Sequence, residues 1–308
     1  MEYITELSSY DSDRQCAVTL GKFDGLHLGH QKLIDKITEY ADKNKELSSV
    51  VFAMDMSGFL LNKGITRKLL MTNQERVAHL ETKVDYLFEC PFTDEFARME
   101  PEVFIRDILV GKLHALHIVV GADYHFGHQK RGDVHMLARY AKQYGYHLDI
   151  IAKERYEGRI ISSTYIREAL LDGNTELANQ LLGYSYTVQG KVEHGRKLGR
   201  TLGFPTMNVT PEPEKLLPKN GVHFCRILID GGWYNGIGNV GMKPTVTNER
   251  KVLVEVFVLD YEADAYGKTI DILFLTFERG EKKFSTIEEL KKQVDRDIIS
   301  GKEYFYEG

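Results

Sequence analysis

Short apolar runs alternate with amphipathic stretches through the first part of the chain. The runs predicted as buried strands cover residues 17–20, 50–54, 86–88, 118–121 and 148–152. Between them, apolar residues recur at helical spacing in residues 30–40, 73–84, 101–113 and 134–145. Near-continuous apolar strands suit a parallel sheet that is covered on both faces, and regular strand–helix alternation is typical of α/β folds. The pattern therefore predicts a doubly wound, Rossmann-like α/β domain.

The periodicity changes after Gly183. Segments with alternating apolar and polar positions cover residues 186–192, 221–229, 233–240, 252–260 and 269–277, and Gly and Asp turns separate them. This spacing predicts an antiparallel barrel or sandwich. The change of period places the boundary between one domain of residues 1–183 and a second of residues 184–308.

The last part of the sequence predicts one closing helix. Ser285 and Glu288 have the spacing of a capping box, in which a hydroxyl and a carboxylate satisfy backbone N–H groups at a helix start. The apolar residues of this region fall on one helical stripe, which consists of Ile287, Leu290, Val294 and Ile298.

Composition and charge narrow the class of protein. A chain of 308 residues suits two compact domains. The net charge of −5 and the pI near 6.1 argue against a general nucleic-acid binder, so any anion site must be local. Cys16, Cys90 and Cys225 show no paired spacing, which suits a reducing compartment. Because no apolar run approaches the roughly 20 residues of a membrane span, we expect a cytoplasmic protein that binds neither membrane nor nucleic acid. The sequence indicates no oligomeric state.

The segment G-K-F-D-G-L-H-L-G-H, Gly21 to His30, is the first candidate for chemistry. It follows the first predicted strand and leads into a helix, where an open parallel sheet places its ligand. Its three glycines allow a phosphate to approach the backbone closely, and His27 and His30 lie on one side of the first helical turn. The segment predicts a phosphate site, although a glycine-rich turn can also exist without a ligand.

A metal site is the other interpretation of these histidines. The same H-x-x-H spacing occurs at His114/His117 and at His125/His128. Neither Cys nor carboxylate residues complete a zinc ligand set beside any of these pairs, so the zinc interpretation is the weaker one.

A second segment, I-S-S-T-Y-I-R from Ile161 to Arg167, adds anion-binding groups. Ser162, Ser163 or Thr164 can cap the helix that follows, and Arg167 lies about one turn into it. Hydroxyls, free N–H groups and a guanidinium together would bind phosphate oxygens. The alternative is a plain helix cap with a solvated arginine.

These two segments, in this order, resemble the nucleotidyltransferase module of bacterial riboflavin kinase/FAD synthetases. The stretch G-A-D-Y-H-F-G, Gly121 to Gly127, followed by Arg131-Gly132-Asp133, is also similar to that family, in which it closes around nucleotide and flavin. The resemblance implies that the phosphate of FMN attacks the α-phosphorus of ATP in line, with Mg²⁺ bridging phosphates, and that pyrophosphate leaves.

The same resemblance implies roles for individual residues. His27, His30 and Arg167 would stabilise the charge that grows on the triphosphate. ATP and its phosphates would contact Gly21, Phe23, Asp24, Gly25, Ser162, Ser163 and Thr164, and nucleotide or flavin would contact Gly121, Asp123 and Phe126. One departure follows the second strand, where Asp55-Met56-Ser57-Gly58 replaces the family's D-P-H-P-like stretch. The pocket for the phosphate acceptor could therefore differ in shape.

A basic, glycine-rich segment, H-G-R-K-L-G-R-T-L-G-F-P-T-M-N, runs from His194 to Asn208. Such a loop can fold over a triphosphate, and Thr206 and Asn208 offer the oxygen ligands that Mg²⁺ accepts. Glu255 lies among apolar neighbours in V-L-V-E-V-F-V-L, where a carboxylate is costly unless it is used or paired. It is a candidate general base for a primary alcohol. The alternatives are a basic surface turn and a salt bridge at a strand end.

These residues closely resemble the riboflavin kinase domain, as do residues 239–245, 266–268 and 281–297. The resemblance implies that Thr206 and Asn208 hold Mg²⁺ and phosphates and that Glu255 activates the ribityl hydroxyl. The loop with Gly195, Lys197 and Gly199 would cover ATP, and Asn239 would contact nucleotide or flavin. It also implies a small antiparallel barrel with a C-terminal helix packed on it.

The predicted function is the synthesis of flavin cofactors from riboflavin, FMN and ATP with Mg²⁺. Riboflavin would be phosphorylated to FMN, and FMN would be adenylylated to FAD. Two alternatives keep the kinase and change the N-terminal module. That module would adenylylate another phosphorylated acceptor, or it would be a weakly active, flavin-binding regulatory module.

Overall fold

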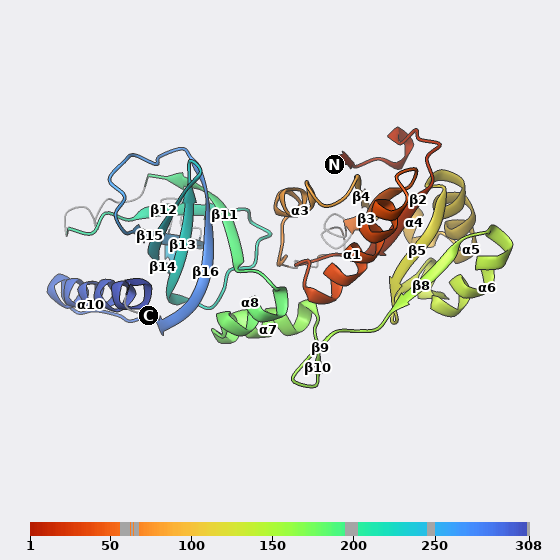
Figure 1. The fold of residues 1–308 in the computed structure, drawn as a ribbon. Helices are drawn as coiled ribbons and strands as arrows, with labels where there is room; N and C mark the ends of the chain where they lie inside the picture. The colour runs from red at the N-terminus through yellow and green to blue at the C-terminus, as the bar shows by residue number, and fades with distance from the viewer. Residues whose placement is uncertain (56–61, 63, 65–67, 195–202, 245–249, 307–308) are drawn as a thin grey trace. The chain divides into compact units, whose positions relative to one another are not determined.

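The computed structural model describes residues 1–55, 62, 64, 68–194, 203–244 and 250–306 (Figure 1). The chain divides into two compact units, Met1–Ser163 and Thr164–Gly308. The elements up to residue 160 are β1 (Glu2–Ile4), η1 (Leu7–Ser9), β2 (Cys16–Gly21), α1 (Leu28–Lys43), β3 (Ser48–Asp55), α3 (Asn73–Leu80), β4 (Tyr86–Pro91), α4 (Asp94–Arg98), α5 (Pro101–Val103), η2 (Phe104–Lys112), β5 (Ala115–Gly121), β6 (His125–Phe126), η3 (His128–Lys130), β7 (Gly132–Asp133), α6 (Val134–Tyr144), β8 (His147–Ile151), β9 (Arg155–Tyr156) and β10 (Arg159–Ile160). They are followed by α7 (Ser163–Asp172), α8 (Thr175–Leu182), β11 (Tyr186–Glu193), β12 (Met207–Pro211), β13 (Gly221–Ile229), β14 (Gly232–Pro244), β15 (Arg250–Val258), β16 (Thr269–Gly280) and α10 (Ile287–Tyr306).

A parallel sheet with the strand order β1-β4-β3-β2-β5-β8 forms the first unit. Every predicted strand and helix of this part is present, which confirms the doubly wound α/β fold. Strand β1 was not predicted. It pairs with β4 through Glu2↔Tyr86 and Ile4↔Phe88, and its three residues are too few to show a period of two.

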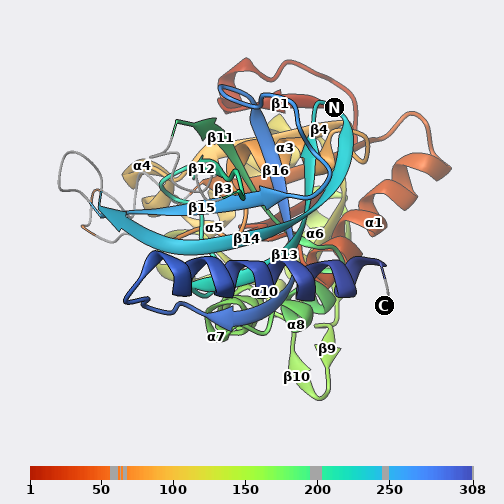
Figure 2. The same cartoon turned by 90° about the vertical axis from the view of Figure 1, so that its left-hand side faces the viewer.

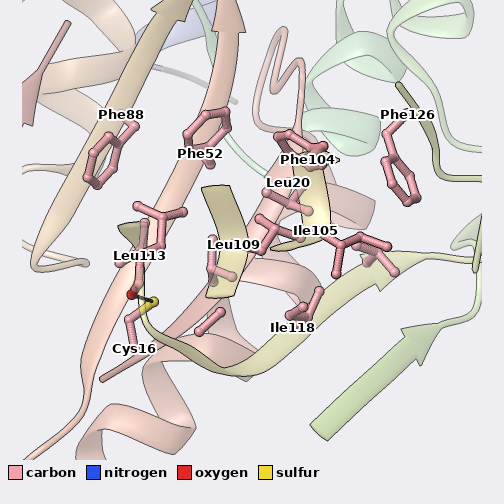
Figure 3. Close-up of a cluster of buried hydrophobic side chains, with 14 of the residues drawn as sticks. Cys16, Leu20, Phe52, Phe88, Phe104, Ile105, Leu109, Leu113, Ile118 and Phe126 are labelled. Carbon is pink, nitrogen blue, oxygen red and sulfur yellow. Dashed lines mark hydrogen bonds between the residues drawn. The ribbon is translucent and has the colours of Figure 1, made fainter. Parts of the chain in front are cut away.

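The apolar core of the first unit is formed by side chains of the sheet strands and of the segments packed against them. Figure 3 shows a cluster that contains Cys16, Leu20, Phe52, Phe88, Phe104, Ile105, Leu109, Leu113, Ile118 and Phe126. Within it the thiol of Cys16 donates a hydrogen bond to the carbonyl of Leu113 (3.1 Å). Ala17, Val51 and Val119 alternate with the cluster residues along their strands and are fully buried too. Both faces of the sheet are therefore covered, as near-continuous apolar strands require.

The order of strands reverses at β2. The chain adds β3 and β4 on one side of β2 and then returns to place β5 and β8 on the other side. The carboxyl ends of β2 and β5 are neighbours, as the register Thr19↔Val119 shows. In open α/β sheets the ligand site lies at such a reversal. The segment that follows Gly21 therefore starts at the position where this fold binds ligands.

A closed antiparallel barrel with the strand order β11-β12-β15-β14-β13-β16 forms the centre of the second unit. Strand β16 pairs with both β11 and β13 and so closes the ring. The alternating pattern alone left barrel and sandwich open, whereas the family resemblance implied a small barrel, and the structure confirms the barrel. Strand β12 was not predicted, because its five residues show alternation over only four positions before Pro211, too few to separate a strand from a loop. The core of the barrel contains buried side chains such as Val188, Val254, Val256 and Phe274.

Helix α10 packs against the outside of the barrel (Figure 2), where Ile298 and Phe305 contact a cluster that includes Phe224 and Ile237. The predicted helix is confirmed, but the predicted capping pair is wrong. Thr286 accepts the hydrogen bond from the Glu289 N–H (3.2 Å), and the Glu289 carboxylate accepts one from the Ser285 N–H (2.9 Å). The capping hydroxyl is therefore that of Thr286, and the Glu289 carboxylate bonds the N–H one residue before this cap.

The predicted apolar stripe of this helix is only partly buried. Leu290, Val294 and Ile298 are half-buried, whereas Ile287 is 54% exposed. Ile287 is the first residue of α10, so it lies at the helix end rather than over the barrel cluster.

Candidate active sites

The turn between β2 and α1 has an unusual backbone. Phe23 (φ 48°), Gly25 (φ 90°) and Leu26 (φ 37°) all lie in the left-handed region, which residues other than glycine rarely adopt. The side chains of Phe23 and Leu26 are fully buried, and their packing holds this conformation. A Cβ atom at position 21 would lie 3.2 Å from the Phe23 ring, so glycine leaves room for that ring.

His27 caps helix α1 with its side chain. Its backbone is extended, and its Nδ1 accepts a hydrogen bond from the His30 N–H (3.3 Å). The His27 and His30 rings are stacked, with centroids 3.7 Å apart and planes inclined by 14°. The Phe23 ring meets His30 edge-on at 5.2 Å. The expectation that both imidazoles lie on one side of the first helical turn is confirmed.

Both imidazoles are neutral near pH 7. Burial lowers the pKa of His27 to about 4. Burial also lowers the pKa of His30 well below its usual value, and the neighbouring His27 and Arg76 lower it further. Because Nδ1 of His27 accepts a hydrogen bond, the proton of this ring is assigned to Nε2, which can donate to an anion. Nδ1 of His30 is buried and has no hydrogen-bond partner among the described residues.

The start of α1 favours an anion. The helix has 16 residues and carries no acidic side chain in its first turn. Its first N–H groups and the positive end of its dipole therefore point toward the turn between β2 and α1, of which His27 is the last residue. A phosphate placed there would meet backbone N–H groups and the imidazoles together.

Asp24 connects this turn to two distant segments. Its carboxylate accepts hydrogen bonds from the backbone N–H groups of Leu70 (2.8 Å) and Met71 (3.3 Å). Its carbonyl accepts a hydrogen bond from the Ser163 hydroxyl (2.8 Å). The structure thus joins the two sequence segments that both predicted phosphate binding, Gly21 to His30 and Ile161 to Arg167, through a contact between residues 139 positions apart.

The sequence did not identify a buried ion pair behind the turn. Arg76 on α3 and Glu89 on β4 form this pair and are 4% and 2% exposed. Nε of Arg76 donates to the carbonyl of Phe23 (3.4 Å), and the Tyr3 hydroxyl donates to Oε2 of Glu89 (2.5 Å). The one available signal was Arg76 itself, which shares a helical stripe with Leu80 and Val84 and so places a charge on the apolar face.

The segment after β5 is shaped by packing. Gly127 (φ 69°) lies against Pro101, and a Cβ atom would come within 2.6 Å of that ring, so only glycine fits. Phe126 is 7% exposed and belongs to the core (Figure 3). Gly132 contacts both of these side chains, and Asp133 caps α6 by accepting from the Met136 N–H (2.8 Å). These residues have clear structural roles, and the contact of Phe126 with a ligand stays a prediction.

Gly121 and Asp123, which were predicted to contact nucleotide or flavin, lie at the carboxyl end of β5 and just after it. Gly121 is the last residue of β5. Asp123 is exposed and pairs with Lys153 (2.7 Å). Their contact with nucleotide or flavin stays a prediction, as does the phosphate contact of Ser162. Thr164 and Arg167 belong to the second unit, on α7, and their roles stay predictions too.

In the barrel, the register brings three predicted residues into one row. Asn208 on β12 lies opposite Glu255 on β15, and Glu255 lies opposite Asn239 on β14. Residues opposite each other on paired strands point to the same face of a sheet. All three are half-buried, and Thr206 directly precedes β12. One face of the barrel therefore presents two amides and a carboxylate side by side.

The surroundings of Glu255 differ from the expectation. Its neighbours Val254 and Val256 are fully buried, whereas Leu253, Glu255 and Phe257 are half-buried. The strand thus alternates, with Glu255 on the outer face of the barrel rather than enclosed by apolar side chains on both faces. The carboxylate is therefore partly accessible to solvent.

Some predicted contacts fall outside the described residues. Gly195, Lys197 and Gly199 do, and so do Met56, Ser57 and Gly58 of the departure from the family pattern. Over the described parts of the chain, no group of three or more His, Cys, Asp or Glu side chains could hold a metal ion, so no zinc ligand set is found there. No helix among the described residues is long and apolar enough to cross a membrane.

Comparisons with known proteins match both halves of the chain. Residues 9–165 match the family model of FAD synthetase, and residues 182–305 match that of riboflavin kinase. The bifunctional riboflavin kinase/FMN adenylyltransferase of Haemophilus influenzae is 34% identical over 293 residues, which cover 94% of each chain. Its counterpart from Listeria monocytogenes is 34% identical over 96% of this chain and 94% of its own, and that from Escherichia coli is 36% identical over 94% and 93%.

A solved structure is similar over the whole length. It is described as a macrolide-efflux protein from Streptococcus pneumoniae, and it matches with a TM-score of 0.88 at 29% identity over 98% of both chains. The transport role in that name belongs to the neighbour alone.

Proposed function

The chain belongs to the bifunctional riboflavin kinase/FMN adenylyltransferase family, and from this premise we propose how the two reactions divide between two segments of the chain. The chain phosphorylates riboflavin to FMN and adenylylates FMN to FAD. We assign the adenylylation to residues 1–183 and the kinase to residues 184–308. The two family matches, which end at residue 165 and begin at residue 182, support this assignment. They also favour the two-activity enzyme over both alternatives.

The stacked imidazoles at the start of α1 are the main observation that supports this location of the adenylylation site. In this reaction a phosphate oxygen of FMN forms a bond to the α-phosphorus of ATP, and the bond to pyrophosphate breaks. The N–H groups of α1 and Nε2–H of His27 would donate to phosphate oxygens as negative charge moves onto the leaving group. Because both rings are already fixed by stacking and capping, they need little rearrangement when the charge develops.

The row of Asn208, Glu255 and Asn239 carries the assignment of the kinase site. Here the ribityl hydroxyl of riboflavin attacks the γ-phosphorus of ATP, and ADP leaves. The Glu255 carboxylate would accept the hydroxyl proton, and the amides beside it would orient the reacting groups.

The side chains of the row also suit Mg²⁺. Asn208 provides a neutral oxygen atom opposite Glu255, and Thr206, two residues earlier, provides a second. Mg²⁺ prefers such oxygen ligands together with phosphates and water. When bound, the ion would neutralise phosphate charge. We propose that Thr206 and Asn208 hold it with ATP.

A single incubation tests both activities. Purified protein is given riboflavin, ATP and Mg²⁺, and FMN and FAD are separated by chromatography over time. We expect FMN to appear first and FAD to follow, and both to be absent when EDTA replaces Mg²⁺. FMN formation without FAD, even from supplied FMN, would contradict the adenylylation of FMN by this protein.

The free and buried thiols of Cys16, Cys90 and Cys225 support a reducing compartment. We propose that the enzyme works in the cytoplasm.

A further inference from the structure

The buried pair of Arg76 and Glu89 lies directly behind the turn that presents the imidazoles. A buried ion pair adds little net stability, because the cost of removing two charges from water offsets their attraction. Apolar side chains of similar size would fill the same space with equal or better stability. The presence of this pair therefore calls for a reason other than stability.

The contacts of Arg76 suggest that reason. Its guanidinium reaches three elements at once: Glu89 on β4, the Asn73 side chain on its own helix (3.4 Å) and the carbonyl of Phe23 in the turn (3.4 Å). Phe23 is one of the left-handed residues of that turn, and its ring contacts His30. Backbone held in such a conformation persists only where the surroundings over-determine it.

The pair is fixed from its other side as well. Oε2 of Glu89 accepts the hydrogen bond from Tyr3 on β1. Contacts therefore run from the sheet edge through Tyr3, Glu89 and Arg76 to the Phe23 carbonyl. Glu89, Asn73 and Phe23 are buried or half-buried, whereas Tyr3 at the sheet edge is 42% exposed, so the direct partners of the guanidinium hold it in a fixed position.

We propose that Arg76 is a positioning residue for the adenylylation, which holds the Phe23 turn so that the His27 and His30 rings face the phosphates, with Glu89 and Tyr3 holding Arg76 in turn. The proposal rests on the assignment of that reaction to residues 1–183. Arg76 contacts no reacting atom in this account, because its guanidinium is engaged by the protein.

The charge of Arg76 also reaches the site. Among the described residues, the rings of His27 and Phe23 contact His30. Burial lowers the pKa of His30 most, and the charges of His27 and Arg76 lower it further. Removing the guanidinium should therefore raise the pKa of His30. A residue that only supported the fold from a distance would leave that pKa unchanged.

The test removes both charges together so that no buried charge loses its partner. In the double variant Arg76→Met with Glu89→Met, we expect kcat for FAD formation from FMN and ATP to fall roughly 100-fold, the size of effect that a misplacement of about 1 Å produces. Formation of FMN from riboflavin, on the other unit, serves as the internal control and should not change. The pKa of His30, measured by NMR titration, should be higher in the double variant than in wild type. The single variant Arg76→Lys keeps a cation that can donate to the same groups, so it should retain most of the wild-type kcat for FAD formation.

A matched control replaces an exposed pair of the same unit, Arg106→Met with Asp107→Met, which should change neither reaction. If the first double variant does not fold, Arg76→Gln with Glu89→Gln replaces the charged pair by two amides and gives the same test. A folded double variant with wild-type kcat for FAD and an unshifted His30 titration overturns the proposal. Failure of the wild-type protein to form FAD would instead contradict the assigned reaction.

Discussion

Substitution of His27 separates its structural role from its chemical one. The side chain caps α1 through Nδ1 and stacks on His30, and Nε2 is its remaining donor. His27→Ala removes all three functions. His27→Asn restores a good helix cap, because Asn accepts the same kind of hydrogen bond from the first turn, but it removes the ring stack and the Nε2 donor.

The structure gives the size of each effect. A lost side-chain cap costs about 1 kcal/mol, and a lost ring stack costs about 0.5–1.5 kcal/mol. His27→Ala should therefore destabilise the first unit by about 2 kcal/mol and His27→Asn by about 1 kcal/mol. For a unit of this size each 1 kcal/mol lowers the melting temperature by roughly 2–4 °C. In both variants we expect the rate of FAD formation to fall by roughly 100-fold or more, as for other lost donors to a developing charge.

The pH dependence provides a second measurement. His27 has a pKa of about 4 in the folded protein, below the usual value of 6.5. The unfolded chain therefore binds a proton between these two pH values that the folded protein does not bind. The stability contributed by the neutral ring is complete above about pH 6.5 and is lost as the pH falls toward 4, by up to about 3 kcal/mol. His27→Asn lacks this titration, so the gap in stability between wild type and variant should narrow as the pH is lowered.

Two assays decide the outcome. Thermal unfolding followed by circular dichroism at several pH values gives the stability of the first unit, and chromatography gives FAD formed from FMN and ATP. If His27→Asn forms FAD at the wild-type rate, His27 only caps the helix, and its assigned role at the phosphates is wrong. A stability gap that does not change between pH 7 and pH 5 would refute the burial of a neutral ring.

Three further predictions concern the second unit. Glu255→Gln should lower FMN formation from riboflavin by about 10²–10⁴-fold and leave FAD formation from supplied FMN intact; loss of both reactions in a folded variant would contradict the separate sites. Gly221 has φ 139°, and a Cβ atom there would collide with the Arg279 carbonyl, so Gly221→Ala should destabilise the barrel by at least about 2 kcal/mol in thermal unfolding. Asp297→Asn should cost about 2–3 kcal/mol by the same measurement, because the mostly buried Arg279 loses its carboxylate partner.

The regular elements were predictable because their burial repeats along the sequence. Strands such as β3 and β13 are long enough to show their pattern, and the change of period marked the start of the barrel. The short strands β1 and β12 have three and five residues and depend on partners far along the chain. No local pattern can indicate such pairing. The shift of the helix cap from Ser285 to Thr286 is a choice between two adjacent hydroxyls, which the sequence alone does not decide.

The residues of the candidate sites could be named from sequence motifs, but most of the contacts between them could not. The sequence placed His27 and His30 together, and the register placed Asn208 opposite Glu255 as a site would need. It did not show that His27 caps its own helix, because histidine is not a common cap. The pair of Arg76 and Glu89 joins a helix to a strand, and such contacts follow from the packing of elements rather than from spacing.

The closed barrel bears on how the nascent chain folds on the ribosome. All sheet pairings of the first unit lie within the first 163 residues, so this unit can fold while translation continues. Strands β11 and β13 each need β16 as a neighbour, and β16 emerges after every other strand of the barrel. Until then both strands have open edges, which invite association with other chains. Products truncated before Thr269 should therefore contain a folded first unit attached to an unclosed, aggregation-prone second one.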